Sequence, residues 1–382
     1  MNRLIKMIRS IVNSRILMNR REISTNLLFY FFVVVALLVT GMGADEYSPV
    51  INLGYPMEIL GFYTEDEPPL PGSSAVLNEN AGNLTYIAPF YYRIKKGGGI
   101  EIFGDVPESQ INKVVTGAHQ KNVKVLALVH NLLYGRGGVG KQAAHGILKN
   151  TGTRRRFIED TLAVVKKAGF DGVNLDIEDI NYSDKNNFSA LVREMKQSLP
   201  AGLVLTVCVP AETGEFIAGS WSRNFDYRAI GEWADRVVVM TYDEHGYSSG
   251  PGPIASVGWV ERVIKYTTAN IPGEKVLLGI PAYGFDWKVD KPRPKYLSYQ
   301  TAQQTAGDVG AVPVFNGTEG VPKFEYEKED AKHEVWFENA QSFKVKTELA
   351  KNRGLKGLAI WRLGMEDPGV WKYVNTEINV IK

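Results

Sequence analysis

The feature that most limits what this chain can fold into is a rhythm of short apolar runs that repeats from residue 55 onward. Each run is rich in β-branched and other apolar residues, as buried strands are, and a turn and a helical pattern follow most of them. Strands that alternate with helices predict a parallel sheet. We count eight such runs: MEILGFY (57–63), LTYIAPF (84–90), VKVLALV (123–129), GVNLDIE (172–178), LVLTVCV (203–209), RVVVMTY (236–242), KVLLGIP (275–281) and LKGLAIW (355–361).

Eight parallel strands in a chain of 382 residues predict an α/β fold of the (β/α)₈ type, a TIM barrel. An open, doubly wound parallel sheet is the alternative architecture. In a barrel the active site gathers at the carboxyl ends of the strands. Polar residues at the ends of these runs are therefore the first candidates for function.

The connection between the seventh and eighth runs is too long for a single crossover helix. It contains Pro-rich and Gly-rich turns (KPRPK and GAVPVFNGTEGVP) and strand-like runs (KFEYE and HEVWFE). We expect residues 286–350 to form a small α+β insertion that makes one wall of a cleft on the barrel's upper face. An ordinary long loop is the alternative, which the β-propensity and aromatic residues of these runs disfavour.

The first 44 residues differ in character from the rest of the chain. Residues 27–39 are 13 consecutive apolar residues behind a basic stretch, and small residues follow at Gly41, Gly43 and Ala44. This is the build of a secretory signal peptide. A retained membrane anchor is the alternative, although the apolar stretch counted through Ala44 has 18 residues where a span needs about 20. Both alternatives place residues 45–382 outside the cytoplasmic membrane. A buried core helix is a third alternative, which the basic residues before the apolar stretch disfavour.

Charge and cysteine content exclude several classes of function. The net charge is +2, but residues 1–44 carry six Lys or Arg against one acid, so the remaining body has a net charge of −3. Such a body lacks the basic surface that binding to nucleic acid requires. Because Cys208 is the only cysteine, an intrachain disulfide and a cysteine-rich zinc cluster are excluded.

Two further patterns are weak. The run GRGGVGKQ (135–142) nearly spells a phosphate-binding loop, but Gln142 stands where Mg²⁺ requires Ser or Thr, so we interpret the run as a glycine-rich loop over the cleft. The five histidines show no paired spacing, and His245 is expected at the rim of the cleft. We therefore expect no metal and no cofactor.

The stretch DGVNLDIE (171–178) is the most informative part of the sequence. Strand alternation turns its apolar residues toward the helices and sends three polar residues into the barrel: Asn174, Asp176 and Glu178. Burying unpaired polar groups costs about 1 to 3 kcal/mol each, so such a column indicates function. Two nearby carboxylates repel each other when both are ionised, which raises the pKa of one of them. Glu178 is the expected acid, and a salt-bridged structural column is the alternative.

Four motifs in this order resemble those of the family 18 glycoside hydrolases, the chitinase-like enzymes. DGVNLDIE resembles the family's D-G-x-D-x-D-x-E on the fourth strand of a (β/α)₈ barrel. MTYD (240–243) resembles its M-x-Y-D, GIPAYG (279–284) resembles its G-x-P-x-Y-G, and Trp361 ends the eighth run as the family's floor tryptophan does. The resemblance covers roughly residues 50–382.

One position departs from the family pattern. Asn174 stands where the family has its middle aspartate, so charge shuttling between that position and Asp176 is lost, although an amide could still hydrogen-bond Asp176. With this Asn, the runs TYDEHGYSSGPGPIAS (241–256) and VWFENAQS (335–342) are similar to the branch of spore cortex-lytic N-acetylglucosaminidases. That branch acts on peptidoglycan.

The resemblance implies retaining, substrate-assisted hydrolysis, in which the substrate's own 2-acetamido group attacks the anomeric carbon. Glu178 would protonate the leaving oxygen and then activate water. Asp176 would hold the acetamido N–H, and Tyr242 would donate its hydroxyl to the acetamido oxygen. The resemblance and the strand positions also imply five residues that bind or line the sugar site: Asp243, Trp361, Tyr283, Met240 and Asn174.

We therefore predict a hydrolase of β-1,4 bonds after N-acetylglucosamine in the peptidoglycan of spore cortex or cell wall. Chitin or its oligosaccharides are the alternative substrate. A glycan-binding protein that has lost turnover is the alternative of a different class, which the retained Glu178 disfavours. We expect an extracellular, wall-associated or spore-associated monomer whose partner is the glycan, with membrane contact only through residues 27–44.

Overall fold

The computed structural model describes residues 54–382 except 133–137, 216–219, 290 and 292. The predicted signal or anchor segment, residues 1–44, lies outside the described residues. Within the part of the chain that is described, no helix has both the length and the apolar character needed to cross a membrane.

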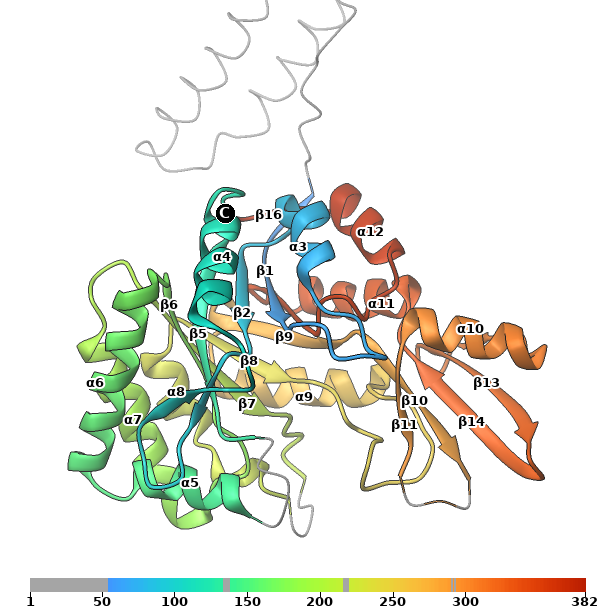
Figure 1. Ribbon diagram of the computed structural model, residues 1–382. Helices are drawn as coiled ribbons and strands as arrows, with labels where there is room; N and C mark the ends of the chain where they lie inside the picture. The colour runs from blue at the N-terminus through green and yellow to red at the C-terminus, as the bar shows by residue number, and fades with distance from the viewer. Residues whose placement is uncertain (1–53, 133–137, 216–219, 290, 292) are drawn as a thin grey trace, which may run out of the picture. The chain divides into compact units, whose positions relative to one another are not determined.

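Eight parallel strands close into a barrel, which confirms the predicted TIM-barrel fold (Figure 1). Each strand pairs in parallel with two neighbours and the last pairs with the first, so the open-sheet alternative is excluded. Every predicted run is one of these strands: β1 (Tyr55–Tyr63), β2 (Tyr86–Pro89), β5 (Lys124–His130), β6 (Gly172–Asp176), β7 (Val204–Pro210), β8 (Arg236–Met240), β9 (Val276–Pro281) and β15 (Gly357–Trp361).

Helices surround the barrel, and each barrel strand is followed by one of them before the next barrel strand (Figure 1). These helices are α3 (Ser74–Asn80), α4 (Glu108–His119), α6 (Thr151–Ala168), α7 (Lys185–Ser198), α8 (Tyr227–Trp233), α9 (Val257–Asn270), α11 (Ala340–Asn352) and α12 (Gly369–Glu377). Shorter helical elements lie in the connections: α5 (Val139–Leu148), η1 (Ala81–Asn83), η2 (Tyr182–Asp184), η3 (Ser222–Asn224) and η4 (Gly273–Lys275).

Three short strands extend the barrel sheet beyond the predicted eight. The hairpin of β3 (Tyr92–Ile94) and β4 (Ile100–Ile102) joins the sheet through β5, and β16 (Ile378–Val380) pairs in parallel with the start of β1. Each is three residues long, which is too short to show a hydrophobic period in the sequence.

The predicted α+β insertion is present between β9 and β15, and Figure 1 shows it projecting from one side of the barrel. Its five strands are all antiparallel, in the order β11-β10-β14-β13-β12. Its elements are β10 (Tyr283–Lys288), β11 (Lys295–Ser298), α10 (Tyr299–Val309), β12 (Val314–Asn316), β13 (Val321–Lys328) and β14 (Ala331–Phe337). Helix α11, which follows β14, packs against β9 and β15 and so covers the barrel itself.

The apolar core of the barrel has two layers because strand residues alternate between its two faces. The outer layer lies between strands and helices, and the inner layer fills the lumen. The lumen residues are Leu60, Phe62, Tyr86, Ala88, Phe90, Leu126, Leu128, Cys208, Val238, Met240, Leu277 and Ala359. Toward the carboxyl ends of β6 and β7 this apolar filling is replaced by polar side chains, and there the site is built.

Candidate active site

Strand β6 carries the polar column that its alternation predicts. Val173 and Leu175 belong to the layer between strands and helices, and Asn174 and Asp176 are buried inside the barrel. Gly172 begins the strand where a Cβ atom would lie 2.0 Å from the carbonyl oxygen of Val204. Only glycine permits that close approach of β6 to β7, which aligns the column.

A cavity of about 510 Å³ opens at the carboxyl ends of the strands above this column. It is lined by six of the eight residues named from the sequence: Asp176, Glu178, Met240, Tyr242, Asp243 and Trp361. Tyr283 lies behind the lining, where its hydroxyl donates a hydrogen bond to Asp243 Oδ1. Asn174 lies deeper in the lumen and is fully buried. The structure thus brings all eight residues together in one region.

Glu178 follows the end of β6, and a side chain from β5's end holds its backbone. Asn131 Oδ1 accepts a hydrogen bond from the Glu178 N–H at 2.8 Å, and Asn131 Nδ2 donates to the Glu178 carbonyl at 2.8 Å. Asn131 is itself buried. These two hydrogen bonds fix the backbone of Glu178, whose carboxyl group extends into the cavity. The sequence did not predict Asn131 as part of the site.

The electrostatics of the two carboxyl groups follow from burial among other acids. Burial raises the pKa of Glu178 well above its usual value, and the negative charges of Asp176, Asp243 and Asp179 raise it further. Burial also raises the pKa of Asp176 to about 6, while a hydrogen bond from the Cys208 thiol acts in the opposite direction. Burial and three neighbouring acids therefore all favour the protonated form of Glu178, which is the form that an acid catalyst needs.

The residues after β8 supply a hydroxyl donor and a further carboxyl group. Burial and the neighbouring acids raise the pKa of Tyr242 well above 10, so its hydroxyl keeps its proton. Burial raises the pKa of Asp243, opposed by the hydrogen bond from Tyr283. A Cβ atom at Gly279 would lie 2.4 Å from the carbonyl oxygen of Val239 and 3.0 Å from the Tyr242 ring. Gly279, the first glycine of the GIPAYG motif, thus makes room for Tyr242.

Trp361 at the end of β15 forms part of the cavity wall. Its ring makes edge-on contacts with Phe62 and Phe90, at centroid distances of 5.1 and 5.7 Å. These lumen aromatics pack against the indole, which also lines the cavity. Aromatic rings held in this way offer a flat apolar surface with a fixed orientation.

The hydrogen bonds of Asn174 differ from the one considered in the sequence analysis. Its Nδ2 donates to Thr206 Oγ1 on β7 at 2.6 Å, and its Oδ1 accepts from the Cys208 thiol at a sulfur–oxygen distance of 3.6 Å. No hydrogen bond between Asn174 and Asp176 is present in the described structure. The neighbouring strand β7, rather than β6 itself, therefore satisfies this amide.

Aromatic side chains that the sequence reasoning missed enlarge the cleft. Trp221 and Trp259 line the cavity, and a second cavity of about 330 Å³ adjoins it with Trp259 in the shared wall. The adjoining cavity is also lined by Glu212, Glu244 and Arg262. Both tryptophans lie outside the strand-end motifs, so no local pattern could have identified them.

The histidines and the glycine-rich run, which are weak patterns in the sequence, show no sign of a metal or phosphate site within the described residues. Among the described residues, no group of three or more His, Cys, Asp or Glu is arranged to hold a metal ion. Residues 135–137 of the glycine-rich run lie outside the described residues, and Lys141 beyond them pairs with Asp179 at 2.8 Å. His245 Nδ1 lies 3.2 Å from the carbonyl oxygen of Gly250.

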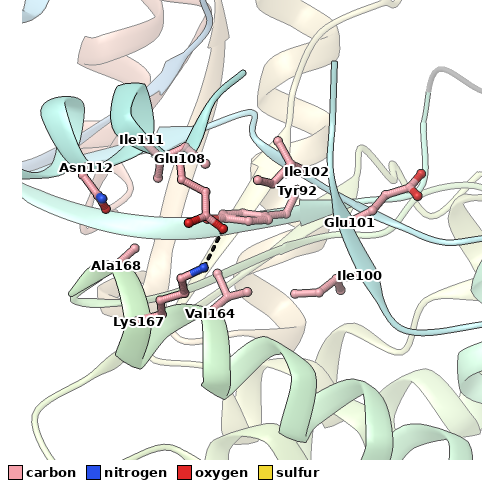
Figure 2. A pocket seen from close by; sticks show the side chains of 10 residues that line it. All are labelled: Tyr92, Ile100, Glu101, Ile102, Glu108, Ile111, Asn112, Val164, Lys167 and Ala168. Carbon is pink, nitrogen blue, oxygen red and sulfur yellow. Dashed lines mark hydrogen bonds and ion pairs between the residues drawn. The ribbon is translucent and has the colours of Figure 1, made fainter. Parts of the chain in front are cut away.

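A further cavity of about 190 Å³ lies on the outside of the barrel, between the β3–β4 hairpin and helices α4 and α6 (Figure 2). Tyr92, Ile100 and Ile102 supply apolar lining, and an ion pair between Glu108 and Lys167 at 2.5 Å crosses it. It shares no lining residue with the cleft. Its charged residues are engaged in ion pairs, Glu108 with Lys167 and Glu101 with Arg93.

Comparison with known proteins agrees with this geometry. The family model described as Glycosyl hydrolases family 18 matches residues 58–366. An uncharacterized glycosylase of Bacillus subtilis (strain 168), YvbX, is 32% identical over 309 residues, which are 79% of this chain and 88% of that protein.

Two solved structures are similar over most of the chain. The Bacillus cereus spore cortex-lytic enzyme SleL matches with a TM-score of 0.76 and 26% identity, over 86% of this chain and 76% of that one. A chitinase from Chromobacterium violaceum ATCC 12472 matches with a TM-score of 0.77 and 28% identity, over 84% of this chain and 98% of that one.

Proposed function

The chain belongs to the glycosyl hydrolases of family 18, and from this premise we propose that it hydrolyses β-1,4 bonds after N-acetylglucosamine in peptidoglycan. The observation that carries the proposal is the grouping of Asp176, Glu178 and Tyr242 in one cavity above the lumen. There burial and neighbouring acids keep the Glu178 carboxyl protonated. We place Glu178, Asp176 and Tyr242 as the catalytic residues.

The proposed reaction begins with proton transfer from Glu178 to the glycosidic oxygen. As the bond to the leaving sugar breaks, the carbonyl oxygen of the substrate's 2-acetamido group attacks the anomeric carbon and forms an oxazolinium ring. Asp176 accepts a hydrogen bond from the acetamido N–H, and its negative charge balances the positive charge that develops on the ring. Tyr242 donates its hydroxyl to the acetamido oxygen, which orients the group for attack.

The second half of the reaction uses the same groups in reverse. Glu178, now ionised, takes a proton from water, and this water attacks the anomeric carbon from the side that the leaving sugar vacated. The oxazolinium ring opens, the acetamido group is restored, and the product keeps the β configuration. Asp243 and Tyr283 would bind the sugar at this subsite, with Trp361 beneath it and Met240 lining the pocket.

Peptidoglycan is the proposed substrate because of the similarity to a spore cortex-lytic enzyme. The two adjoining cavities with their tryptophan walls also support a polymeric glycan that extends beyond a single sugar. Chitin is the second candidate, and the similarity to a chitinase over 84% of the chain favours it. We place the enzyme at the spore or cell wall as a monomer, with residues 1–44 as a signal peptide or a membrane anchor.

Product analysis distinguishes the two substrates. Purified spore cortex, vegetative peptidoglycan and chitin oligomers are each digested, and the fragments are identified by mass spectrometry. We expect cortex or wall fragments with N-acetylglucosamine at the new reducing end. Turnover of chitin oligomers alone would assign the second candidate, and no fragments from any of the three would contradict the proposal.

The mechanism has its own test in the acetamido group. A thiazoline analogue of the cyclised intermediate is expected to inhibit, and a glycan de-N-acetylated at the cleaved sugar is expected to be inert. Proton NMR during the first turnovers should show the β anomer as the initial product. Efficient cleavage of the de-N-acetylated glycan would overturn the substrate-assisted mechanism while leaving the choice of polymer untouched.

A further inference from the structure

The polar part of the lumen is an unusual place for a thiol. Cys208 points into the barrel from β7, is 1% exposed, and lies among the lumen residues. Its Sγ lies 3.6 Å from Asn174 Oδ1, to which it donates. Asn174 in turn donates to Thr206 Oγ1 at 2.6 Å, so the amide is engaged at both of its ends by β7.

The carboxyl group of Asp176 lies next to the same thiol. One of its oxygens, Oδ1, is buried and has no hydrogen-bond partner within the described part of the chain. Such an unpaired buried oxygen is costly. Leu175 on β6 is the register partner of Val207 on β7, so the next residues along the two parallel strands, Asp176 and Cys208, lie side by side. Burial keeps the thiol protonated by raising its pKa well above the usual value.

We propose that Cys208 is a positioning residue for hydrolysis, whose single thiol hydrogen is shared between Asn174 Oδ1 and the Asp176 carboxylate. This proposal rests on the proposed role of Asp176. A thiol is a weak donor, so Asp176 is oriented without being held back from the substrate's acetamido N–H.

The groups that face Asp176 come from four strands. Glu178 follows it on its own strand, Tyr242 and Asp243 follow β8, and Cys208 lies on β7. On β5 its register partner is His130, which is buried and neutral because burial lowers its pKa to about 3. Tyr242 and protonated Glu178 also offer donors, and His130 carries its ring proton on Nε2, because Nδ1 accepts the Leu132 N–H at 3.0 Å. That Nε2 is buried and has no partner within the described residues. A substitution at Cys208 leaves all three of these donors in place, so its effect on the titration of Asp176 reports on the thiol.

The test is the pH dependence of kcat/KM in Cys208→Ala and Cys208→Ser. Turnover requires ionised Asp176, so the acid limb of the profile follows the coupled titration of Asp176 and Glu178. Removing the thiol removes a donor to the ionised form, and we expect the acid limb of Cys208→Ala to move upward by about 0.5 to 1 pH unit. The hydroxyl of Cys208→Ser is a stronger donor, so its acid limb should move below that of the wild type.

The matched control is Val238→Ala. Val238 is the register partner of Cys208 on β8 and belongs to the same lumen layer, but it has no polar atom. It should lower thermal stability and leave the acid limb in place. An equal shift in Val238→Ala, or an unshifted limb in both Cys208 variants, would overturn the proposal. If Cys208→Ala fails to fold, Cys208→Ser alone tests the proposal. An acid limb of Cys208→Ser at or above the pH of the wild-type limb would contradict the shared hydrogen bond.

A second measurement does not depend on turnover. Because Cys208 is the only cysteine, the infrared S–H stretching band reports on this thiol alone. In Glu178→Gln, which removes the titration of Glu178, the band should move to lower frequency as Asp176 ionises. A band that stays constant with pH would overturn the proposal. Residual full activity in Glu178→Gln would instead contradict the proposed function, so the two failures are distinct.

Discussion

The two ends of the barrel lumen both hold buried carboxylates, but only one end pairs them with cations. At the amino ends of the strands, Glu58 on β1 accepts hydrogen bonds from Arg236 Nε and Nη2, each at 2.6 Å, and Lys356 Nζ lies 3.7 Å away. At the carboxyl ends, no ion pair joins Asp176 or Glu178 to a cation within the described structure, and the charged neighbours of Glu178 are other acids.

This difference separates a carboxylate that supports the fold from one that is available for chemistry. A buried carboxylate with two guanidinium hydrogen bonds has a counter-charge beside it, and removing either partner leaves the other charge buried alone. A buried carboxylate among other acids has a raised pKa and keeps its proton, at a cost to the stability of the folded state. Substitutions at the two ends should therefore act on different properties and with opposite signs.

The largest expected effect is on turnover, at Glu178. Glu178→Gln retains the shape and the Asn131 contacts, which are made with the backbone, but removes the transferable proton. We expect kcat to fall by about 10² to 10⁴ with glycan binding retained. Steady-state kinetics and binding of an uncleaved oligosaccharide check this. A variant with more than half of the wild-type rate would remove Glu178 from the role of acid.

The next effect is on stability, at the other end of the lumen. Glu58→Gln leaves Arg236 largely buried without its counter-charge, and we expect a loss of about 3 kcal/mol in the free energy of unfolding. Urea unfolding measures the loss. The pH dependence of kcat/KM in the folded variant should match the wild type, because Glu58 lies at the opposite end from the cleft. A moved acid limb would show that the two ends are coupled.

A stability change of opposite sign is expected at Asp176. Its folded-state pKa is about 6 against the ordinary 3.8, so the wild type loses stability as the pH rises from about 4 to above 6. Asp176→Asn abolishes this loss and should be more stable than the wild type at pH 8, by at most about 3 kcal/mol. The two proteins should converge below pH 4. Urea unfolding at pH 3.5 and pH 8 tests it, and equal stabilities at both would contradict the raised pKa.

What the sequence could predict at each end depends on how local the signal is. The polar column of β6 was visible because one strand's alternation places its residues, and the eight runs predicted the barrel in the same way. The Glu58–Arg236 pair joins residues 178 positions apart, and neither lies in a recognisable motif. The partner of the Asn174 amide was missed for a related reason. It lies on the neighbouring strand, so it depends on the register of β6 against β7.

The smallest expected effect on stability is at an ion pair outside the lumen, which serves as the reference for the two ends of the lumen. Lys167 and Glu108 pair at 2.5 Å across the outer cavity of Figure 2, with 68% and 60% of their side chains exposed. Water already solvates both ions, so Lys167→Ala should cost less than about 0.5 kcal/mol, and still less in high salt. Urea unfolding at two salt concentrations, together with kcat/KM, checks this. A loss above about 1 kcal/mol would mean that the lysine's apolar stem, rather than its charge, closes the cavity over Val164 and Ile111.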